Sequence, residues 1–522
     1  MQRFIQKHAA DVIGVLSGFD RMRFRGTLRW LSNTKGMRSF LWAAQILLKD
    51  FKSYVTNVTD QVRAATARLA AQAGRPVLYL NSPSQRKEDE ARRIAERDGI
   101  GEGLICVLTC VERCFSYDVG PNRQTKKLEL RGGTKQCLHE YFYFQDPQLG
   151  LMHLRLQTWF PFTIHVCLNG REWLARQMDQ AGLGYRRSEN CFLDLADPAA
   201  AQKLADAQLK TRWKSLFQRL VQQVHPTHAQ IFRDYPTQYY WSLEESEWAT
   251  DVMFRSSQAL AKLYPRLLRH GIGDFSSADV LRFLGRKVPA HGGVNGHFQG
   301  EVVSDLKQRP EGLRIKHRVN HNSIKMYDKQ GSVLRVETTI NNTRDMKVFR
   351  RAEGVRRGAR RWQKLRKGVA DLQRRAKISQ AANERYLDAL AEVDQTRPLG
   401  EVVDVVCRPV EWNGQRVRAL QPWSPDDAAL LAAIARPEFL LHGFRNRDLR
   451  PLLFGAGQVS VEEARRQSGK VTRKLRMLRA HGLVTKISKT HRYQLTARGR
   501  TIITALLAAR QANTQQLTQL AA

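Results

Sequence analysis

The chain has 522 residues, 42% of them hydrophobic, which is enough apolar material for several folded domains. It carries 86 Lys and Arg against 49 Asp and Glu, a net charge of +37 that a polyanion such as DNA or RNA best offsets; the alternatives are an unusually basic protein or a basic face on anionic lipid. Seven cysteines exclude a disulfide framework, and no apolar run approaches the roughly 20 residues that span a bilayer, so we expect a cytoplasmic protein without a membrane segment.

The succession of elements predicts a multidomain α+β protein with mixed or antiparallel sheets, a helical middle region and a C-terminal winged helix. Residues 1–75 are expected to be mostly helical, with a basic segment, SGFDRMRFRGTLRWL, at the front. Arginine interleaved with Phe and Trp suits phosphates and stacked bases, whereas an amphipathic helix with an arginine face is the alternative. The nucleic-acid-binding residues expected here are Arg21, Arg23, Arg25 and Arg29.

Residues 76–195 are interpreted as an α+β domain. An apolar strand, an amphipathic helix ended by Gly99 and a second apolar strand predict one βαβ unit, and alternating segments after it predict antiparallel strands. Four side chains in this region have the spacing of a zinc site, although small buried cysteines are ordinary in an apolar strand and zinc is the less favoured interpretation. They are Cys110, Cys114, Cys137 and His139.

Residues 196–290 are expected to be helical, and residues 291–343 to be rich in β-strand. The acidic segment SLEESEWATD is read as a helix, on which three carboxylates share one face and either collect a metal beside a phosphate or counter nearby arginines. These carboxylates are Glu244, Glu247 and Asp251. His317 and His321, four residues apart in HRVNH, are either metal ligands or ordinary surface and core histidines.

The segment IKMYDKQGSVLRVETTI (324–340) predicts a β-hairpin. Strand alternation places Tyr327 and Asp328 on opposite faces of the first strand, and it places Arg335 and Glu337 on one face of the second. The register set by the turn decides whether Tyr327 and Glu337 share a face.

Tyr-Asp-Lys, a turn and Arg-x-Glu in this hairpin resemble a stretch in the rolling-circle replication initiators of plasmids and phages. In those families a tyrosine attacks a DNA phosphodiester, and carboxylates hold the divalent metal that polarises it. The resemblance implies that Tyr327 is the nucleophile and that Glu337 and Asp328 bind Mg²⁺ or Mn²⁺. It also implies that Lys325 or Lys329 contacts the phosphate. The alternatives are a ribbon that binds nucleic acid without catalysis and a purely structural hairpin.

Residues 344–396 are expected to form a basic helical segment, because positions 344–377 hold fourteen Lys and Arg against three acids. This segment is either a phosphate clamp or a solvated linker. The residues expected to contact nucleic acid are Arg356, Arg357, Arg360 and Arg361. Residues 397–424 are expected to be a short β connection with an Asn-Gly turn at 413–414.

Residues 425–522 predict a winged helix-turn-helix, in which a third, basic helix is followed by a hairpin. An apolar stripe marks that helix and the residue after it: Val471, Leu475, Leu478 and Leu483. The phrase LRMLRAHGLVTKISKTHRYQLTARG resembles the recognition helix and wing of MarR-like bacterial regulators, which implies DNA binding; contact with protein or RNA is the alternative. The expected phosphate contacts are Arg473, Lys474, Arg476, Arg479, Lys489 and Arg492.

These patterns together predict a protein that binds DNA, RNA or both. One hypothesis is a metal-dependent single-strand nickase or replication initiator of a mobile element that uses Tyr327. The other is a binder without catalytic activity, either a winged-helix regulator or the protein part of a ribonucleoprotein. No glycine-rich loop followed by Lys-Ser or Lys-Thr is present, so no nucleotide cofactor is expected.

Overall fold

The computed structural model describes residues 1–286, 301–309, 312–344, 346–351, 358–391, 399–436, 438–439, 443–455, 457, 459–487 and 490–513. The chain forms two compact units. The first comprises residues 1–272, 283–286 and 303–390; the second comprises residues 273–282, 287–302 and 391–522.

The first unit is built on an eleven-stranded sheet. Its strands are β1 (Val12–Thr27), β2 (Val77–Tyr79), β3 (Gly103–Pro121), β4 (Leu128–Asp146), β5 (Gly150–Gln157), β6 (Ile164–Asn169), β9 (Tyr240–Phe254), β10 (Val302–Arg309), β11 (Gly312–Val319), β12 (Asn322–Lys329) and β13 (Val333–Ile340). The strand order is β10-β11-β12-β13-β9-β1-β6-β5-β4-β3-β2. β2 and β3 pair in parallel, whereas β1, β9, β12 and β13 at the centre pair antiparallel. The central strands therefore come from three distant parts of the chain.

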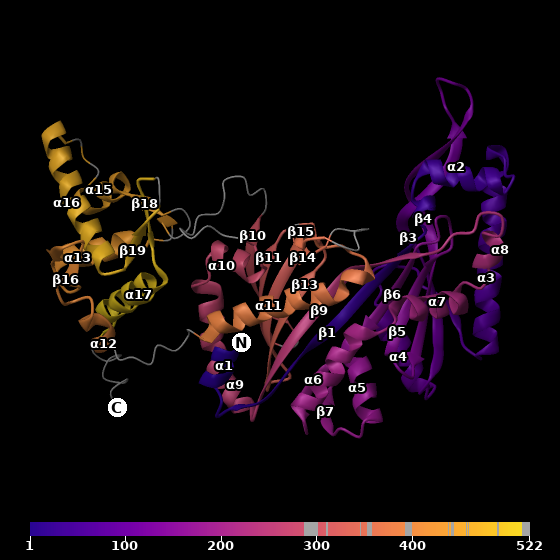
Figure 1. Ribbon diagram of the computed structural model, residues 1–522, viewed down its shortest axis with the longest axis horizontal. Coiled ribbons are helices and arrows are strands. Elements are labelled where there is room, and N and C mark those ends of the chain that lie inside the picture. Colours follow the sequence, from indigo (N-terminus) through magenta and orange to yellow (C-terminus); the bar gives the residue numbers. More distant parts are fainter. Residues whose placement is uncertain are drawn as a thin grey trace. The chain divides into compact units, whose positions relative to one another are not determined.

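Helices cover the sheet and fill the connections between its strands. In the first unit they are α1 (Gln2–Lys7), α2 (Thr34–Ala43), α3 (Phe51–Gln72), α4 (Lys87–Arg97), α5 (Gly170–Gln180), α6 (Pro198–Ala207), α7 (Trp213–Val224), α8 (His228–Ile231), α9 (Ser257–Gly273) and α11 (Leu372–Leu390). Two small ribbons accompany them: β7 (Tyr185–Ser188) with β8 (Cys191–Leu195), and β14 (Lys347–Arg350) with β15 (Arg361–Lys364). Figure 1 shows α11 lying along β9 and β13.

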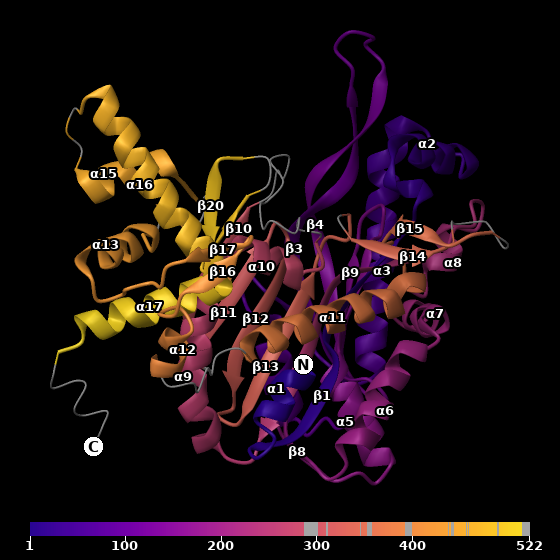
Figure 2. The ribbon, with the colours of Figure 1, turned by 60° about the vertical axis from the view of Figure 1, so that its left-hand side comes forward.

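The two faces of the sheet are covered differently. On one face, Phe24, Phe142 and Leu154 belong to a large apolar core with α2, α3, α7 and the start of α11. On the other face, α4 covers Tyr141 and Tyr143 on β4, while α5 and α6 pack on β1. Between these two patches no described helix covers the second face, which forms a hollow lined mostly by polar side chains. Figure 2 shows the hairpin of β3 and β4 projecting beyond the neighbouring helices.

Residues 12–27 form the strand β1, so the expectation of a mostly helical N-terminal segment is wrong for the basic segment. Its arginines alternate with buried Met22 and Phe24, a period of two that fits a strand and not a helix. The acidic segment also forms a strand, β9, in place of the expected helix. Further along the middle region, α6, α7 and α9 are helical as expected.

The basic segment after residue 344 differs from its prediction in the same way. Residues 347–350 and 361–364 form the β14–β15 ribbon, and α11 begins only at Leu372. The βαβ unit is confirmed, because β2 and β3 are parallel and α4 connects them, followed by Gly99 in a left-handed conformation. The range 291–343, expected to be rich in β-strand, contains β10 to β13, and its first ten residues lie outside the described part of the chain.

The second unit has a small core of its own. Its elements are α10 (Ser277–Phe283), α12 (Leu399–Asp404), β16 (Val410–Trp412), β17 (Gln415–Val417), α13 (Pro425–Ile434), β18 (Phe444–Arg445), α15 (Asn446–Phe454), α16 (Val461–Ala480), β19 (Val484–Lys486), β20 (Arg492–Leu495) and α17 (Ala497–Gln511). The predicted order of three helices and a hairpin is present, and the whole apolar stripe of α16 and Leu483 is buried. The turn at Asn413 and Gly414 joins β16 to β17 with both residues at positive φ.

Candidate functional site

The hairpin of β12 and β13 places four of its polar side chains on one face of the sheet. Lys325 lies opposite Glu337, and Tyr327 lies opposite Arg335. Directly opposed residues project to the same face, and the Tyr327 hydroxyl donates a hydrogen bond to Glu337 Oε2 at 3.0 Å. The register that the sequence left open therefore brings the predicted nucleophile and the predicted metal ligand together.

A β-bulge brings a second carboxylate to this place. Between Phe19 and Arg21 the pairing of β1 with β9 shifts by one residue, and both Asp20 and Arg21 line the same hollow. Bulges re-aim side chains in this manner, and they are frequent beside active sites. Arg21 lies opposite Glu247 on β9. The bulge thus adds Asp20 to a face on which Glu247 already lies.

One carboxylate from each of three strands meets here: Asp20, Glu247 and Glu337, which we call the carboxylate triad. Each offers an oxygen within 4.8 Å of the other two. Asp20 and Glu337 are buried, and Glu247 is half-buried. Among the described residues this is the only group of three or more Asp, Glu, His and Cys side chains with metal-binding spacing. Carboxylate oxygens are the donors that Mg²⁺ and Mn²⁺ prefer.

Two buried arginines form ion pairs with Asp20 of the triad or with its neighbour Asp251. Arg335 is fully buried; its Nε lies 2.6 Å from Asp251 Oδ1, and its Nη1 lies 3.4 Å from Asp20 Oδ2. From the other side, Arg171 of α5 reaches Asp251 Oδ2 at 3.0 Å. Asn169 caps the start of that helix, and Gly170 approaches Phe19 so closely that a Cβ would lie 2.0 Å from its carbonyl oxygen. The position of Asp20 is therefore set by packing as well as by charge.

A lysine shares the charge of two triad members. Lys325 Nζ lies 2.6 Å from Glu337 Oε1 and 3.2 Å from Glu247 Oε1. Although burial acts in the opposite sense, Lys325 and then Arg335 hold the pKa of Glu337 below its usual range. Burial and the neighbouring Glu337 raise the pKa of Glu247 to about 7. Burial and Glu337 also raise the pKa of Tyr327 well above its usual value, so the hydroxyl keeps its proton.

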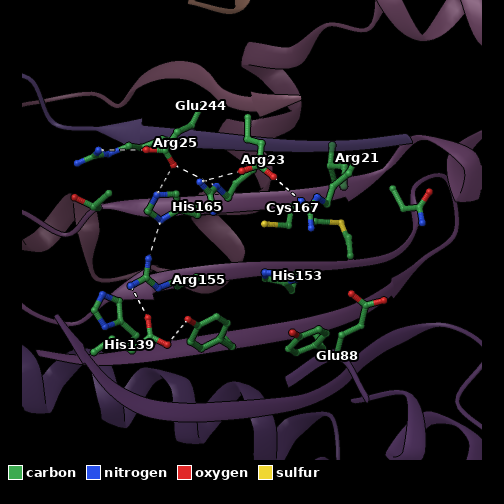
Figure 3. A pocket seen from close by; sticks show the side chains of 18 of the residues that line it. Arg21, Arg23, Arg25, Glu88, His139, His153, Arg155, His165, Cys167 and Glu244 are labelled. Atoms are coloured by element: carbon green, nitrogen blue, oxygen red, sulfur yellow. Dashed lines mark hydrogen bonds and ion pairs between the residues drawn. The ribbon is translucent and has the colours of Figure 1, made fainter. Parts of the chain in front are cut away.

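The triad adjoins a hollow of about 990 Å³, the central groove, which extends over β1, β6, β5 and β4. Figure 3 shows the side chains that gather in it. Arg23 and Arg25 pair with Glu244 at 3.3 and 3.6 Å, and Arg21 pairs with Glu245 at 2.5 Å. The arginines predicted to contact phosphate therefore lie in the groove, but carboxylates of β9 already compensate their charge.

The groove also holds neutral histidines around Arg155, which pairs with Glu112 at 2.6 Å. Burial and nearby cations lower the pKa of His139 to about 4 and that of His153 to about 3. Burial, opposed by a hydrogen bond to Glu244, lowers the pKa of His165 as well. These rings are uncharged at neutral pH and offer one donor and one acceptor each.

On the other side of the triad, β11 presents three cations to the same face. We call Arg314, Lys316 and Arg318 the β11 cations. Arg314 lies opposite Tyr327, and Lys316 lies opposite Lys325. Burial, followed by Lys325 and Arg314, lowers the pKa of Lys316. Among the described carboxylates, none forms a salt bridge with a β11 cation, so these charges are available to an anion beside Tyr327.

The other predicted side chains near the hairpin lie elsewhere. Asp328 is on the opposite face from Tyr327, so it is not part of the triad. Lys329 shares the face of Tyr327 but reaches Glu189 at 3.5 Å. His317 is buried on the far face, with Ser304 Oγ at 2.8 Å and the Tyr386 hydroxyl at 3.1 Å. Its environment is that of a core histidine.

The remaining predicted contacts divide between both units. Arg29 stacks on the ring of Tyr240 at 3.3 Å, and Arg360 and Arg361 lie exposed at the β14–β15 ribbon. The four side chains considered for zinc lie on β3 and β4, and they are not among the described groups with metal-binding spacing; His139 Nδ1 bonds to the Cys137 carbonyl oxygen at 3.1 Å. Three further predicted residues lie outside the described part of the chain: Arg356, Arg357 and Lys489.

The predicted cations of α16 have different surroundings. Arg473 is exposed, whereas Lys474 Nζ lies 3.5 Å from the buried Asp427. Arg476 bonds to Gln415, and Arg479 lies 4.9 Å from the ring centre of Trp412. These three contacts attach α16 to its own unit. Arg492 lies on β20 of the hairpin.

Comparisons of the chain with family models, curated proteins and solved structures gave no match. None of the described helices is both long enough and apolar enough to span a bilayer.

The sequence patterns did not identify two parts of this site. Asp20 gave no pattern signal, because its orientation depends on the bulge. The β11 cations alternate with Ile315 and His317 in RIKHR, and this period of two could have identified them.

Proposed function

We propose that the protein binds a single nucleic-acid strand at the central groove and cuts it by a metal-dependent transfer of the phosphodiester to Tyr327. One observation carries the proposal: the carboxylate triad, a hydrogen-bonded tyrosine and the β11 cations share one face of the sheet. Carboxylates hold a divalent cation, which polarises a phosphoryl oxygen. The β11 cations bind the remaining phosphate charge.

The chemical step balances with groups on this face. Tyr327 Oη forms a bond to phosphorus while its proton passes to Glu337, the acceptor of its hydrogen bond. The bond from phosphorus to the leaving nucleoside oxygen breaks, and that oxygen takes up, through water, the proton that Glu337 received, so Glu337 is a carboxylate again. The strand end stays joined to the protein as a phosphotyrosine. Burial and then Glu337 raise the pKa of Tyr327, and a dication held by the triad would offset the part due to Glu337.

The second unit supports a role on nucleic acid. The helix α16, which is the third of the series α13, α15 and α16, exposes cations including Arg466, Lys470 and Arg473, which lie near one another at helical spacing. A basic helix before a β-hairpin is the part of a winged helix that enters the major groove. We therefore propose that the second unit recognises duplex DNA, as expected for the replication initiator of a mobile element.

A second candidate is a nucleic-acid binder without catalytic activity. Lys325 already bridges Glu247 and Glu337, in the place where a metal would bind. Tyr327 is only 8% exposed. In this case the charged cluster is a structural element, and the protein is a regulator or a component of a ribonucleoprotein.

The test incubates the full chain with circular single-stranded DNA and Mn²⁺, and in parallel with single-stranded RNA. We expect linear DNA joined to the protein, loss of this product in Tyr327→Phe and in Glu337→Gln, and its retention in the control Asp328→Asn. Asp328 is the matched control because it is an acid of the same hairpin on the opposite face.

Two results would overturn the nickase. One is equal cutting by Tyr327→Phe, which leaves a metal-activated water as the nucleophile. The other is the absence of cutting by the wild type on both substrates, together with RNA that co-purifies with the protein. That pair of results supports the binder.

A further inference from the structure

The β14–β15 ribbon exposes two aromatic rings that face each other across its strands. Phe349 is 56% exposed and Trp362 is 64% exposed. They are directly opposed in the ribbon, and their ring centres lie 5.8 Å apart. The opposite face of β14 instead carries Val348, which belongs to an apolar cluster with Ile340 and Leu365. The ribbon thus has one packed face and one face with exposed rings.

Two lysines flank the rings. Lys347 lies directly opposite Lys364, and strand alternation places both on the exposed face. Like charges in directly opposed positions destabilise a ribbon, so this pair costs stability unless an anion lies over it. Base-stacking rings beside paired cations are the arrangement that single-stranded nucleic acids require.

The ribbon borders a hollow of about 910 Å³, the ribbon groove, whose other side is α11. Eight Lys and Arg side chains line it, and no Asp or Glu does among the described residues. Beneath them the buried Asp371 pairs with Arg366 at 3.1 Å and with Arg374 at 2.7 Å. One carboxylate thus orients several cations without neutralising them all.

This groove is distinct from the central groove. The helix α11 packs on the face of the sheet that carries Trp248, whose Nε1 donates to Gln380 Oε1 at 2.8 Å. The carboxylate triad lies on the other face, with Glu247. A ligand in the ribbon groove does not touch the triad.

We infer that the ribbon groove is a second binding site, for an unpaired segment of nucleic acid whose bases stack on Phe349 and Trp362 and whose phosphates contact the cations around them. The inference rests on the nucleic-acid-binding part of the proposed function, but not on its catalytic part. A duplex suits the rings less well, because its bases are already stacked on each other and their faces are covered.

The test measures the anisotropy of fluorescein-labelled 15-mers in EDTA, so that no metal is needed. The probes are oligo(dT), oligo(rU), a 15-base-pair duplex and an abasic 15-mer, which keeps the phosphates and lacks the bases. We expect Phe349→Ala with Trp362→Ala to weaken oligo(dT) binding by tenfold or more. The same double variant should bind the abasic strand as the wild type does.

Trp42→Ala is the matched control, because Trp42 of α2 is 84% exposed and does not line the ribbon groove. Thermal unfolding verifies that every variant folds. The inference is overturned if the double variant binds oligo(dT) as tightly as Trp42→Ala does, or if the double variant loses as much affinity for the duplex as for oligo(dT). The ratio of the affinities for oligo(rU) and oligo(dT) indicates whether the groove prefers RNA or DNA. A failed nicking assay leaves these outcomes unaffected.

Discussion

The central groove and the ribbon groove belong to the same unit, yet they treat charge in opposite ways. Among the residues that the structure describes, six arginines and six carboxylates line the central groove, whereas eight cations and no carboxylate line the ribbon groove. In the first, the protein supplies its own counter-charges, which hold each other in fixed geometry. In the second, the described residues supply the buried Asp371 as counter-charge for several of the cations. Fixed geometry suits chemistry at one phosphate, and uncompensated charge suits affinity for a chain of phosphates.

The largest effect is expected from Arg335→Met in the central site. The change leaves Asp251 and Asp20 buried without this cation, and removing one partner of a buried ion pair costs about 3–5 kcal/mol of unfolding free energy. Arg360→Met in the ribbon groove should change stability by less than about 0.5 kcal/mol. Urea unfolding measures both. Equal effects of the two changes would remove the distinction between the grooves.

The next effect is a pH dependence. The folded state holds the pKa of Glu247 near 7, above the unfolded 4.5, so its contribution to stability is present below pH 4.5 and is lost as the pH rises through 7. Without metal, the buried histidines with lowered pKa values raise the unfolding free energy between pH 5 and pH 8. Glu247 acts in the opposite sense, with a share on the order of 1–3 kcal/mol. Burial also raises the pKa of Glu140 to about 7, so both groups contribute with the same sign.

The measurement is therefore the difference between wild type and Glu247→Gln across this pH range. The unfolding free energy of the Gln variant should rise relative to that of the wild type as the pH increases, and Phe349→Ala in the ribbon should keep the slope of the wild type. Mn²⁺ binds the ionised carboxylate, so it should stabilise the wild type more at pH 8 than at pH 5. An unchanged slope in Glu247→Gln would show that the triad does not hold the extra proton.

A smaller effect concerns the lysines of the ribbon. Lys347→Gln with Lys364→Gln should reduce the slope of log affinity against log salt for a single strand by about 1.4, or roughly 0.7 for each lost phosphate contact. Stability should stay constant or rise by a few tenths of a kcal/mol, because the opposed charges are gone. Salt titrations of oligonucleotide binding and urea unfolding report the two quantities. A fall in stability with no change in slope would make the lysines structural.

The smallest effect extends the comparison to the second unit. Arg473→Ala should weaken duplex binding several-fold and leave stability unchanged, since this side chain is exposed. Lys474→Ala should instead lower the stability of the unit by about 1 kcal/mol, because the buried Asp427 loses one partner and keeps Arg418 at 2.7 Å. Gel shifts with a duplex and thermal unfolding distinguish the two. Reversed roles would place the exposed face of α16 away from DNA.

Part of the site could be predicted from local sequence. Alternation along β12 and β13 correctly separates Tyr327 from Asp328. The missing information was the register. The turn contains Gln330 and Gly331 at positive φ, and three residues separate Lys329 from Val333, its partner. A turn of two residues would have shifted Tyr327 away from Arg335 and would have moved the side chains of one strand to the other face.

The two central strands were harder to identify. In β1 the alternation is interrupted at Asp20, and in the pairing with β9 it is interrupted again between Arg23 and Phe24. Each bulge adds one residue, so two consecutive polar side chains lie on the same face of the sheet. The period of two that identifies a strand is lost there, and the pattern resembles that of a helix. The triad itself depends on three strands that are distant in sequence, and no local pattern records which strands become neighbours.

The strand order has a consequence for synthesis of the chain. β1 leaves the ribosome first, but its partner β9 starts at Tyr240 and the hairpin that carries Glu337 comes later still. At about 5–20 residues per second, a newly made Asp20 waits roughly 15–60 seconds before Glu337 exists. During that interval β6 and then β9 become available to pair with β1, but the edge of β9 that β13 covers stays unpaired. Release of a chain truncated before residue 333 would therefore leave the centre of the sheet open, and such fragments should be retained by chaperones or degraded.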